Sequence, residues 1–161
     1  MDIDSMICVA KVGDADQIAV MSRDLIEHGM GWNWRAEAVE KSIQDPNTNV
    51  AVLREKGRIR GFGIMRYLDD EAHLVLFAVA RANQRKGIGS ALLRWLEVAA
   101  GIAGAQRIRV EARRENAAAR CFYNEHGYHE VKLEPGMYRK KLDGIRLEKW
   151  LRASYAKRGG E

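Results

Sequence analysis

The stretch that most constrains this chain is QRKGIGSALL, residues 84–93, where two glycines separated by one residue lead directly into an apolar helical pattern. Over residues 88–102 the apolar side chains recur every three or four positions, which predicts a long amphipathic helix. A strand candidate, residues 71–79, precedes the loop. A glycine loop between a strand and a helix directs backbone N–H groups and the positive end of the helix dipole to one point. This arrangement predicts an anion-binding loop.

Two well-known phosphate loops do not fit the spacing. A dinucleotide-binding fingerprint needs a third glycine where Leu92 stands, and a nucleoside-triphosphatase P-loop needs four residues between its glycines, followed by Lys-Ser or Lys-Thr. Glycine is useful in such a loop because a Cβ would block a phosphate or exclude a positive φ. The alternative is a helix N-terminus without a ligand, since Gly-x-Gly is common.

Periodicity over the rest of the chain predicts one mixed α/β domain without internal repeats. Asp14 with Gln17 three residues later is typical of a capping box and predicts the start of the first helix. We expect Pro135-Gly136 in a loop between the last two strands. The expected helices cover 14–29, 35–44, 88–102 and 116–126, and the expected strands cover 7–12, 49–54, 58–67, 71–79, 107–111, 128–133 and 144–151.

Composition sets the broad class. A chain of 161 residues with 47% hydrophobic residues suits a single domain. No apolar run approaches the ~20 residues that span a bilayer, and the N-terminus lacks a signal pattern, so we expect a soluble, cytoplasmic protein without a membrane partner. Cys8 and Cys121 have no metal-ligand spacing, so we expect reduced, partly buried thiols and no metal. The net charge of +5 would suit nucleic acid, ribosomes, acidic peptides or a polyphosphate cofactor, and does not choose among them.

The order β-α-α-β-β-β-α-β-α-β-β, with QRKGIGSALL after the fourth strand and NAAARCFYNEHGY after the fifth, resembles the GNAT acetyltransferase superfamily over about residues 6–151. In that family, (Gln/Arg)-x-x-Gly-x-(Gly/Ala) binds the pyrophosphate of acetyl-CoA. The segment EARRENAAA is most similar to the bacterial N-terminal acetyltransferases of ribosomal proteins. The motif positions here are Gln84, Gly87 and Gly89, followed downstream by Asn116, Ala119, Tyr123, Gly127 and Tyr128.

The resemblance implies a fold, a cofactor and a site for it. The fold is a GNAT domain over residues 1–151, with a mixed, mostly antiparallel sheet of about seven strands and about four helices, followed by a basic tail at 152–161. Acetyl-CoA is the implied co-substrate, and its acetyl group passes to a primary amine by direct attack. The implied cofactor-binding residues are Phe77, Ala78 and Val79 for the pantetheine arm, Gln84, Arg85, Lys86, Gly87, Ile88, Gly89 and Ser90 for the pyrophosphate, and Asn116.

Two residues compete for the role of the base that removes a proton from the amine. Glu111, at the end of the fifth expected strand, falls where the ribosomal-protein N-terminal acetyltransferases place theirs, and we favour it because the surrounding block matches that group. His73 falls where the histone-modifying members place theirs, and an unperturbed pKa of about 6.5 suits neutral pH. The alternatives are Glu111 as an ordinary salt-bridge partner of nearby arginines and His73 as a half-exposed strand residue.

Tyr123 lies seven residues after Asn116, on the same face of the expected helix, so both can point at one ligand. In the family this tyrosine protonates the leaving CoA thiolate. A thiolate of pKa ~8.5 is a weaker base than a phenolate of pKa ~10, so hydrogen bonding to the thiolate is expected to be much of the contribution. The alternatives are a core tyrosine beside Phe122 and a helix cap at Asn116.

The acceptor amine is the least constrained part of the sequence. Family members form the acceptor site from the loop between the first two helices and the loop between the last two strands, which here offer Trp32, Trp34 and Tyr138. Met137-Tyr138 stands where the ribosomal-protein enzymes usually carry Tyr-Tyr. The hypotheses are therefore a protein N-terminal amine, a small-molecule amine or a lysine, and a non-catalytic acetyl-CoA-binding module, in a monomer or homodimer; the basic charge makes a nucleic-acid module a further alternative.

Overall fold

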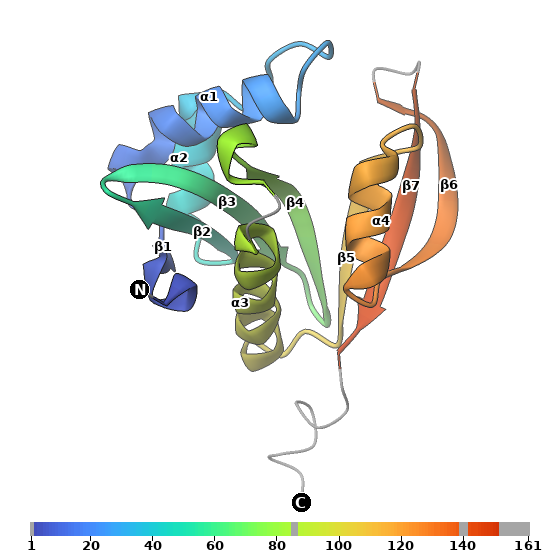
Figure 1. Ribbon diagram of the computed structural model, residues 1–161. Coiled ribbons are helices and arrows are strands. Elements are labelled where there is room, and N and C mark those ends of the chain that lie inside the picture. The colour runs from blue at the N-terminus through green and yellow to red at the C-terminus, as the bar shows by residue number, and fades with distance from the viewer. Residues whose placement is uncertain (1, 85–86, 139–141, 152–161) are drawn as a thin grey trace, which may run out of the picture.

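The computed structural model describes residues 2–84, 87–138 and 142–151, and over these ranges it forms one sheet of seven strands with four α-helices (Figure 1). Neighbouring strands are antiparallel except β4 and β5, which are parallel. The α/β fold class and the expected element order are confirmed. In sheet order the strands are β1 (Ile7–Val9), β2 (Thr48–Glu55), β3 (Arg58–Tyr67), β4 (Glu71–Val79), β5 (Arg107–Arg113), β7 (Leu142–Trp150) and β6 (His129–Tyr138), and the helices are α1 (Ala15–Leu25), α2 (Ala36–Gln44), α3 (Ile88–Ile102) and α4 (Ala117–Glu125).

The helices cover the sheet in two layers with a hydrophobic core on each side. One core joins α1 and α2 to β2, β3 and β4, around Ile18, Val39 and Phe62. The other core joins α3 and α4 to the opposite face, around Leu92 and Leu96. The apolar period of three and four residues in α3 places one continuous stripe against this face, as the sequence predicts.

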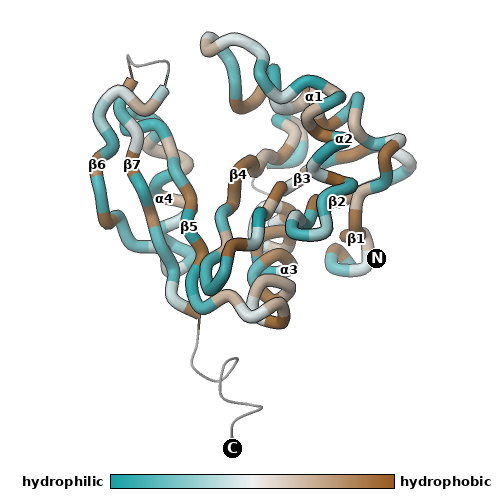
Figure 2. The backbone as a smooth tube through the Cα atoms, turned by 180° about the vertical axis from the view of Figure 1, so that it is seen from behind, coloured by the Kyte–Doolittle hydropathy of each residue, from teal (hydrophilic) through white to brown (hydrophobic). Residues whose placement is uncertain are grey.

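Strands β4 and β5 are paired along only part of their length. The pairs run from Glu71 opposite Arg107 to Leu74 opposite Val110, and then the strands diverge (Figures 1 and 2). A register shift between β3 and β4 lies at the same level, so Leu74 packs in the α3-side core and Leu76 in the α1-side core. From residue 75 onward, β4 therefore has a strand partner on one edge only.

Three local expectations need correction, the first only in part. Asp14 is the N-cap of α1 as expected, but its side chain does not bond the helix backbone, because its carboxylate accepts two hydrogen bonds of 2.9 Å from Arg54 instead. Pro135-Gly136 lies within β6 rather than in a loop; β6 is an edge strand, where a proline is tolerated, and its register shifts between Glu134 and Tyr138. Cys8 and Cys121 are exposed rather than partly buried.

The helices described by the structure include none that is both long and apolar enough to cross a membrane. Arg85, Lys86 and the tail expected at 152–161 lie outside the described residues.

Candidate active site

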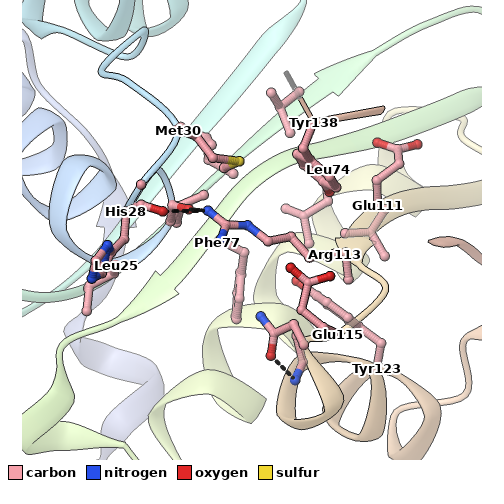
Figure 3. A pocket seen from close by; sticks show the side chains of 18 residues that line it. Leu25, His28, Met30, Leu74, Phe77, Glu111, Arg113, Glu115, Tyr123 and Tyr138 are labelled. Carbon is pink, nitrogen blue, oxygen red and sulfur yellow. Dashed lines mark hydrogen bonds between the residues drawn. The ribbon is translucent and has the colours of Figure 1, made fainter. Parts of the chain in front are cut away.

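The divergence of β4 and β5 encloses a cavity of about 610 Å³ (Figure 3). One wall comes from Leu74, Val75, Leu76 and Phe77 of β4, and the other comes from the end of β5. Helix α4 contributes Tyr123, and Tyr138 of β6 and the segment that follows α1 complete the lining. The cavity is therefore lined by β4, β5, α4, β6 and the segment after α1, and its walls carry both apolar and polar side chains.

Glu111 is a partly buried carboxylate on the β5 wall. Its Oε1 accepts a hydrogen bond of 2.5 Å from Nε2 of His73, and its Oε2 lies 3.3 Å from Nε of Arg109 and 3.9 Å from Nε of Arg146. Burial raises the pKa of Glu111, but the hydrogen bond with His73 and the charges of Arg109 and Arg146 outweigh it, and the pKa lies below the usual 4.5. Glu111 is therefore an anion at neutral pH, and it is also the salt-bridge partner that the alternative described.

His73 is adjacent to Glu111 but does not line the cavity. Its second nitrogen, Nδ1, lies 3.0 Å from Nη2 of Arg109. Because a guanidinium only donates, Nδ1 must accept, and the ring proton is on Nε2, where it is donated to Glu111. Both nitrogens of His73 therefore have hydrogen-bond partners. Of the two residues, Glu111 is the one that lines the cavity.

Tyr123 is buried on α4 among aromatic rings, with ring centroids 5.4 Å from Phe122, 5.5 Å from Tyr128 and 6.4 Å from Phe77. Burial, with a smaller effect of nearby Tyr138, raises its pKa well above the ordinary value of 10. The phenol therefore keeps its proton at any physiological pH. On the same helix, Oδ1 of Asn116 accepts from N of Ala119 at 3.1 Å, so Asn116 is the helix cap, as one alternative predicted.

The two glycines of the loop, Gly87 and Gly89, occupy positions that favour glycine for different structural reasons. Gly87 has φ +81° and ψ +1° and is the N-cap of α3, a left-handed conformation that favours glycine. Gly89 lies in a tight contact, because a Cβ there would be 3.3 Å from the ring of Phe122 on α4. The first hydrogen bond of the helix runs from N of Ala91 to O of Gly87, so the N–H groups of residues 88–90 point from the helix N-terminus.

Side chains around this N-terminus tie it to its neighbours. Nε2 of Gln84 donates to O of Val79 at 3.0 Å, which closes the loop onto the end of β4. Ser90 Oγ lies 2.9 Å from Nε2 of His126, whose Nδ1 donates to O of Phe122. The Ile88 side chain is buried in the core, so this residue offers only its backbone to a ligand.

Of the residues predicted for the acceptor, Tyr138 lines the cavity, Trp32 lines a neighbouring pocket that shares His28 and Gly29 with it, and Trp34 lines neither. Nε1 of Trp32 donates to O of Ala19 at 3.1 Å, and guanidinium groups of Arg23 and Arg35 lie 5.3 and 4.7 Å from its ring centroids. Trp34 packs against the α1-side core. Both indoles are therefore part of the structure around α1.

The position of the tryptophan segment is fixed by Glu27, a buried carboxylate that the sequence analysis did not single out. Glu27 is 7% exposed and accepts hydrogen bonds from N of Asn33 and N of Trp34, and from Oγ of Ser22. These bonds hold residues 33 and 34 against α1. The part of the predicted loop that lines the cavity is His28, Gly29 and Met30, whereas the sequence analysis had singled out its tryptophans.

Arg113 is the second residue that sequence analysis missed. It lines the cavity, and its Nη2 donates to O of Ile26 and O of His28 (Figure 3). Its position was a usable signal, because Arg113 follows Glu111 by two residues and a strand places such residues on one face. Among the residues that the structure describes, no group of three or more His, Cys, Asp or Glu side chains is arranged to hold a metal ion.

Residues 46–130, just over half of the chain, match the family model described as "Acetyltransferase (GNAT) domain". The chain belongs to the GNAT acetyltransferase family. A relative of this GNAT chain is the [ribosomal protein bS18]-alanine N-acetyltransferase of Escherichia coli K12, 34% identical over 86 residues, which are 53% of this chain and 58% of the relative. The match thus spans little more than half the length of that relative.

Solved structures share the fold of this GNAT chain. The ribosomal-protein-S18-alanine N-acetyltransferase from Escherichia coli superposes with a TM-score of 0.78 at 24% identity, covering 89% of this chain and 92% of the other. The PaiA N-acetyltransferase from Thermoplasma acidophilum, solved in complex with coenzyme A, superposes with a TM-score of 0.76 at 16% identity, covering 90% and 98%. At these identities the likeness establishes the fold.

Proposed function

We propose that the protein transfers the acetyl group of acetyl-CoA to a primary amine, and that this amine is the N-terminal α-amino group of a protein. The observation that carries the proposal is the pairing of an ionised carboxylate, Glu111, with a protonated phenol, Tyr123, on two walls of one cavity. An acceptor for a proton and a donor of one are what acetyl transfer from a thioester to an amine requires. Family membership and the name of the Escherichia coli relative support the same activity.

The residues present fit acetyl-CoA, which when bound would supply the acetyl thioester. The N–H groups at the start of α3, after Gly87, suit the pyrophosphate, because they carry the positive end of the helix dipole. The edge of β4 that β5 leaves unpaired, at Phe77, Ala78 and Val79, suits the amides of the pantetheine arm. Asn116 keeps its side-chain N–H₂ group for the same arm while its oxygen caps α4. Gln84, Ile88, Gly89 and Ser90 complete this proposed site, together with Arg85 and Lys86, which the structure does not describe.

The chemistry favours an amine of low pKa. Deprotonating an α-amino group of pKa ~8 at pH 7 costs about 1.4 kcal/mol, whereas a lysine of pKa ~10.4 costs about 4.6 kcal/mol. Because the pKa of Glu111 is lowered, the carboxylate is a weak base that accepts a hydrogen bond more readily than it holds a proton. Glu111 would orient the amine, and Tyr123 would donate its hydrogen bond to the leaving sulfur. An N-terminal amine asks least of such a base.

A panel of acceptors tests this function by measuring release of free CoA from acetyl-CoA. The panel holds peptides with a free N-terminus and no lysine, N-terminally blocked peptides with one lysine, polyamines and aminoglycosides. We expect the free-N-terminus peptides to give the highest kcat/KM. Preference for a small amine or a lysine would contradict the proposed N-terminal acceptor, but it would still support acetyl transfer from acetyl-CoA. Binding of acetyl-CoA without acetylation of any amine would indicate the non-catalytic module.

Replacing Glu111 by glutamine tests the role of the carboxylate. We expect Glu111→Gln to lower kcat/KM for the acceptor by about 10²–10³-fold, with the affinity for acetyl-CoA unchanged in calorimetry. The matched control is Glu148→Gln, which removes a carboxylate from β7 that does not line the cavity. An equal loss in both variants would assign the effect to the charge of this face rather than to Glu111.

A further inference from the structure

Arg113 connects two walls of the cavity. From β5, Nη2 of Arg113 donates hydrogen bonds of 3.0 Å to O of Ile26 and 2.9 Å to O of His28, residues that precede it by 87 and 85 positions (Figure 3). Ile26 is the C-cap of α1, where helix carbonyls lack intrahelical partners and the dipole favours a cation. The contact therefore joins α1 to β5 where β4 and β5 have diverged.

The segment that Arg113 holds is the one that lines the cavity. His28, Gly29 and Met30 contribute to its wall. On its other side the same segment is anchored by buried Glu27, which bonds to residues of its own half of the molecule. Gly29 and Gly31 have φ of +79° and +80°, so the backbone bends at both. Glu27 thus fixes the segment to α1, and Arg113 fixes it to β5.

The contact lies on the face of the sheet that an acceptor would approach. Arg113 and Glu111 are two residues apart on β5 and point to the same face, whereas Ala112 between them is buried in the α3-side core. The N-terminus of α3, which suits the pyrophosphate, belongs to that opposite side. A substitution at Arg113 should therefore weaken binding of the amine more than binding of acetyl-CoA.

We propose that Arg113 is a positioning residue that sets the acceptor side of the cavity by holding residues 26–30 against β5. This inference rests on the proposed acetyl transfer for its kinetic consequence. The two hydrogen bonds come from a charged group, so each exceeds an ordinary hydrogen bond in strength. Without them the segment loses these hydrogen bonds to β5, and the wall that orients the amine beside Glu111 is no longer fixed from that side.

The first test measures acceptor kinetics for Arg113→Met. We expect KM for the acceptor to rise about tenfold or more, because both charge-assisted hydrogen bonds are lost, with kcat within about twofold. The affinity for acetyl-CoA in calorimetry should stay unchanged. Arg113→Lys, which keeps the charge but not the forked donors, should recover part of the loss. Arg114→Met is the control, because Arg114 is 60% exposed, pairs with Asp143 and does not line the cavity.

The second test needs no activity. Hydrogen–deuterium exchange of the acetyl-CoA complex should show faster exchange in residues 26–31 for Arg113→Met, and not for Arg114→Met. Unchanged exchange there, or a rise spread evenly over the molecule, would overturn the proposal even if KM increased. A fall in acetyl-CoA affinity equal to the loss for the acceptor would also overturn it. If the wild type acetylates no amine, the proposed function fails, and the exchange result still decides for or against Arg113. Should Arg113→Met not fold, Arg113→Lys gives both readouts.

Discussion

At the scale of single residues, burial decides how Tyr123 can take part in the proposed reaction. Its raised pKa keeps the phenol protonated, so it is always able to donate a hydrogen bond. The same rise makes full transfer of the proton to a thiolate of pKa ~8.5 more costly than the ~2 kcal/mol that unperturbed groups would require. Tyr123 is therefore suited to stabilising the thiolate as a hydrogen-bond donor, and its position beside the cavity allows that.

The variant Tyr123→Phe isolates this hydroxyl. We expect kcat to fall by about 10²-fold, the lower range for acid–base groups, while acetyl-CoA affinity stays nearly unchanged, because the ring and its aromatic neighbours remain. Steady-state kinetics and calorimetry on the same samples give both quantities. Turnover equal to that of the wild type would remove Tyr123 from the mechanism.

At the scale of elements, close approach of α3 to β3 holds the α3-side core together. Gly61 and Gly63 of β3 face this helix without side chains, and a Cβ at Gly63 would lie 2.5 Å from Cδ1 of Leu96. Leu96 is fully buried, so its side chain has little room to move. The alternation of small and large residues across this contact positions the N-terminus of α3 beside the end of β4.

We expect Gly63→Ala to lower the free energy of unfolding by about 1–3 kcal/mol, because the added methyl group overpacks the core. Urea denaturation followed by circular dichroism gives the difference. Gly13→Ala is the control, since a Cβ at Gly13 meets nothing within 4 Å and its φ is not positive. If both variants unfold at the same urea concentration, the core around Gly63 accommodates the added methyl group and the close packing there does not exclude a side chain.

At the scale of the whole molecule, carboxylates with lowered pKa connect distant segments. The hydrogen bonds from Arg54 on β2 lower the pKa of Asp14, next to α1, and His73 with two arginines lowers that of Glu111 against the effect of burial. On the other side of the sheet, buried Glu97 of α3 accepts from Oη of Tyr128 and from Nζ of Lys149 on β7. The layers are thus joined by charged pairs as well as by apolar packing.

The lowered pKa values of Asp14 and Glu111 predict sensitivity to acid. A pKa that is lower in the folded than in the unfolded state contributes stability above the unfolded value, and that stability is lost as pH falls through the folded value. For Asp14 the reference is 3.8 and for Glu111 it is 4.5. The urea midpoint should therefore be nearly level from pH 7 to about 5 and fall below about 4.5.

The variant Asp14→Asn should be less stable at pH 7 and show a shallower fall in the urea midpoint on acidification, because one of the linked groups is gone. Asp16→Asn is the control. Asp16 is exposed, and its carboxylate makes no hydrogen bond or ion pair with the described residues. The same pH slope in Asp14→Asn and the wild type would show that the Arg54 pair does not contribute to acid sensitivity.

The sequence by itself determined the order of the elements and the family, because hydrophobic period, the glycines at 87 and 89 and the EARRENAAA block are properties of contiguous residues. It failed where a local signal met a distant partner. The side chain of Asp14 pairs with Arg54 instead of bonding the backbone of α1, and Pro135-Gly136 continues an edge strand.

Only the tertiary structure decided how the candidate site is arranged. The register shift in β4 and its divergence from β5 create the cavity, and they place Glu111 on its wall with His73 behind it. Buried Glu27 turns the tryptophan segment to the core, and Arg113 reaches across to α1. These contacts join residues far apart in the chain, so their geometry depends on how the layers pack and not on any local pattern.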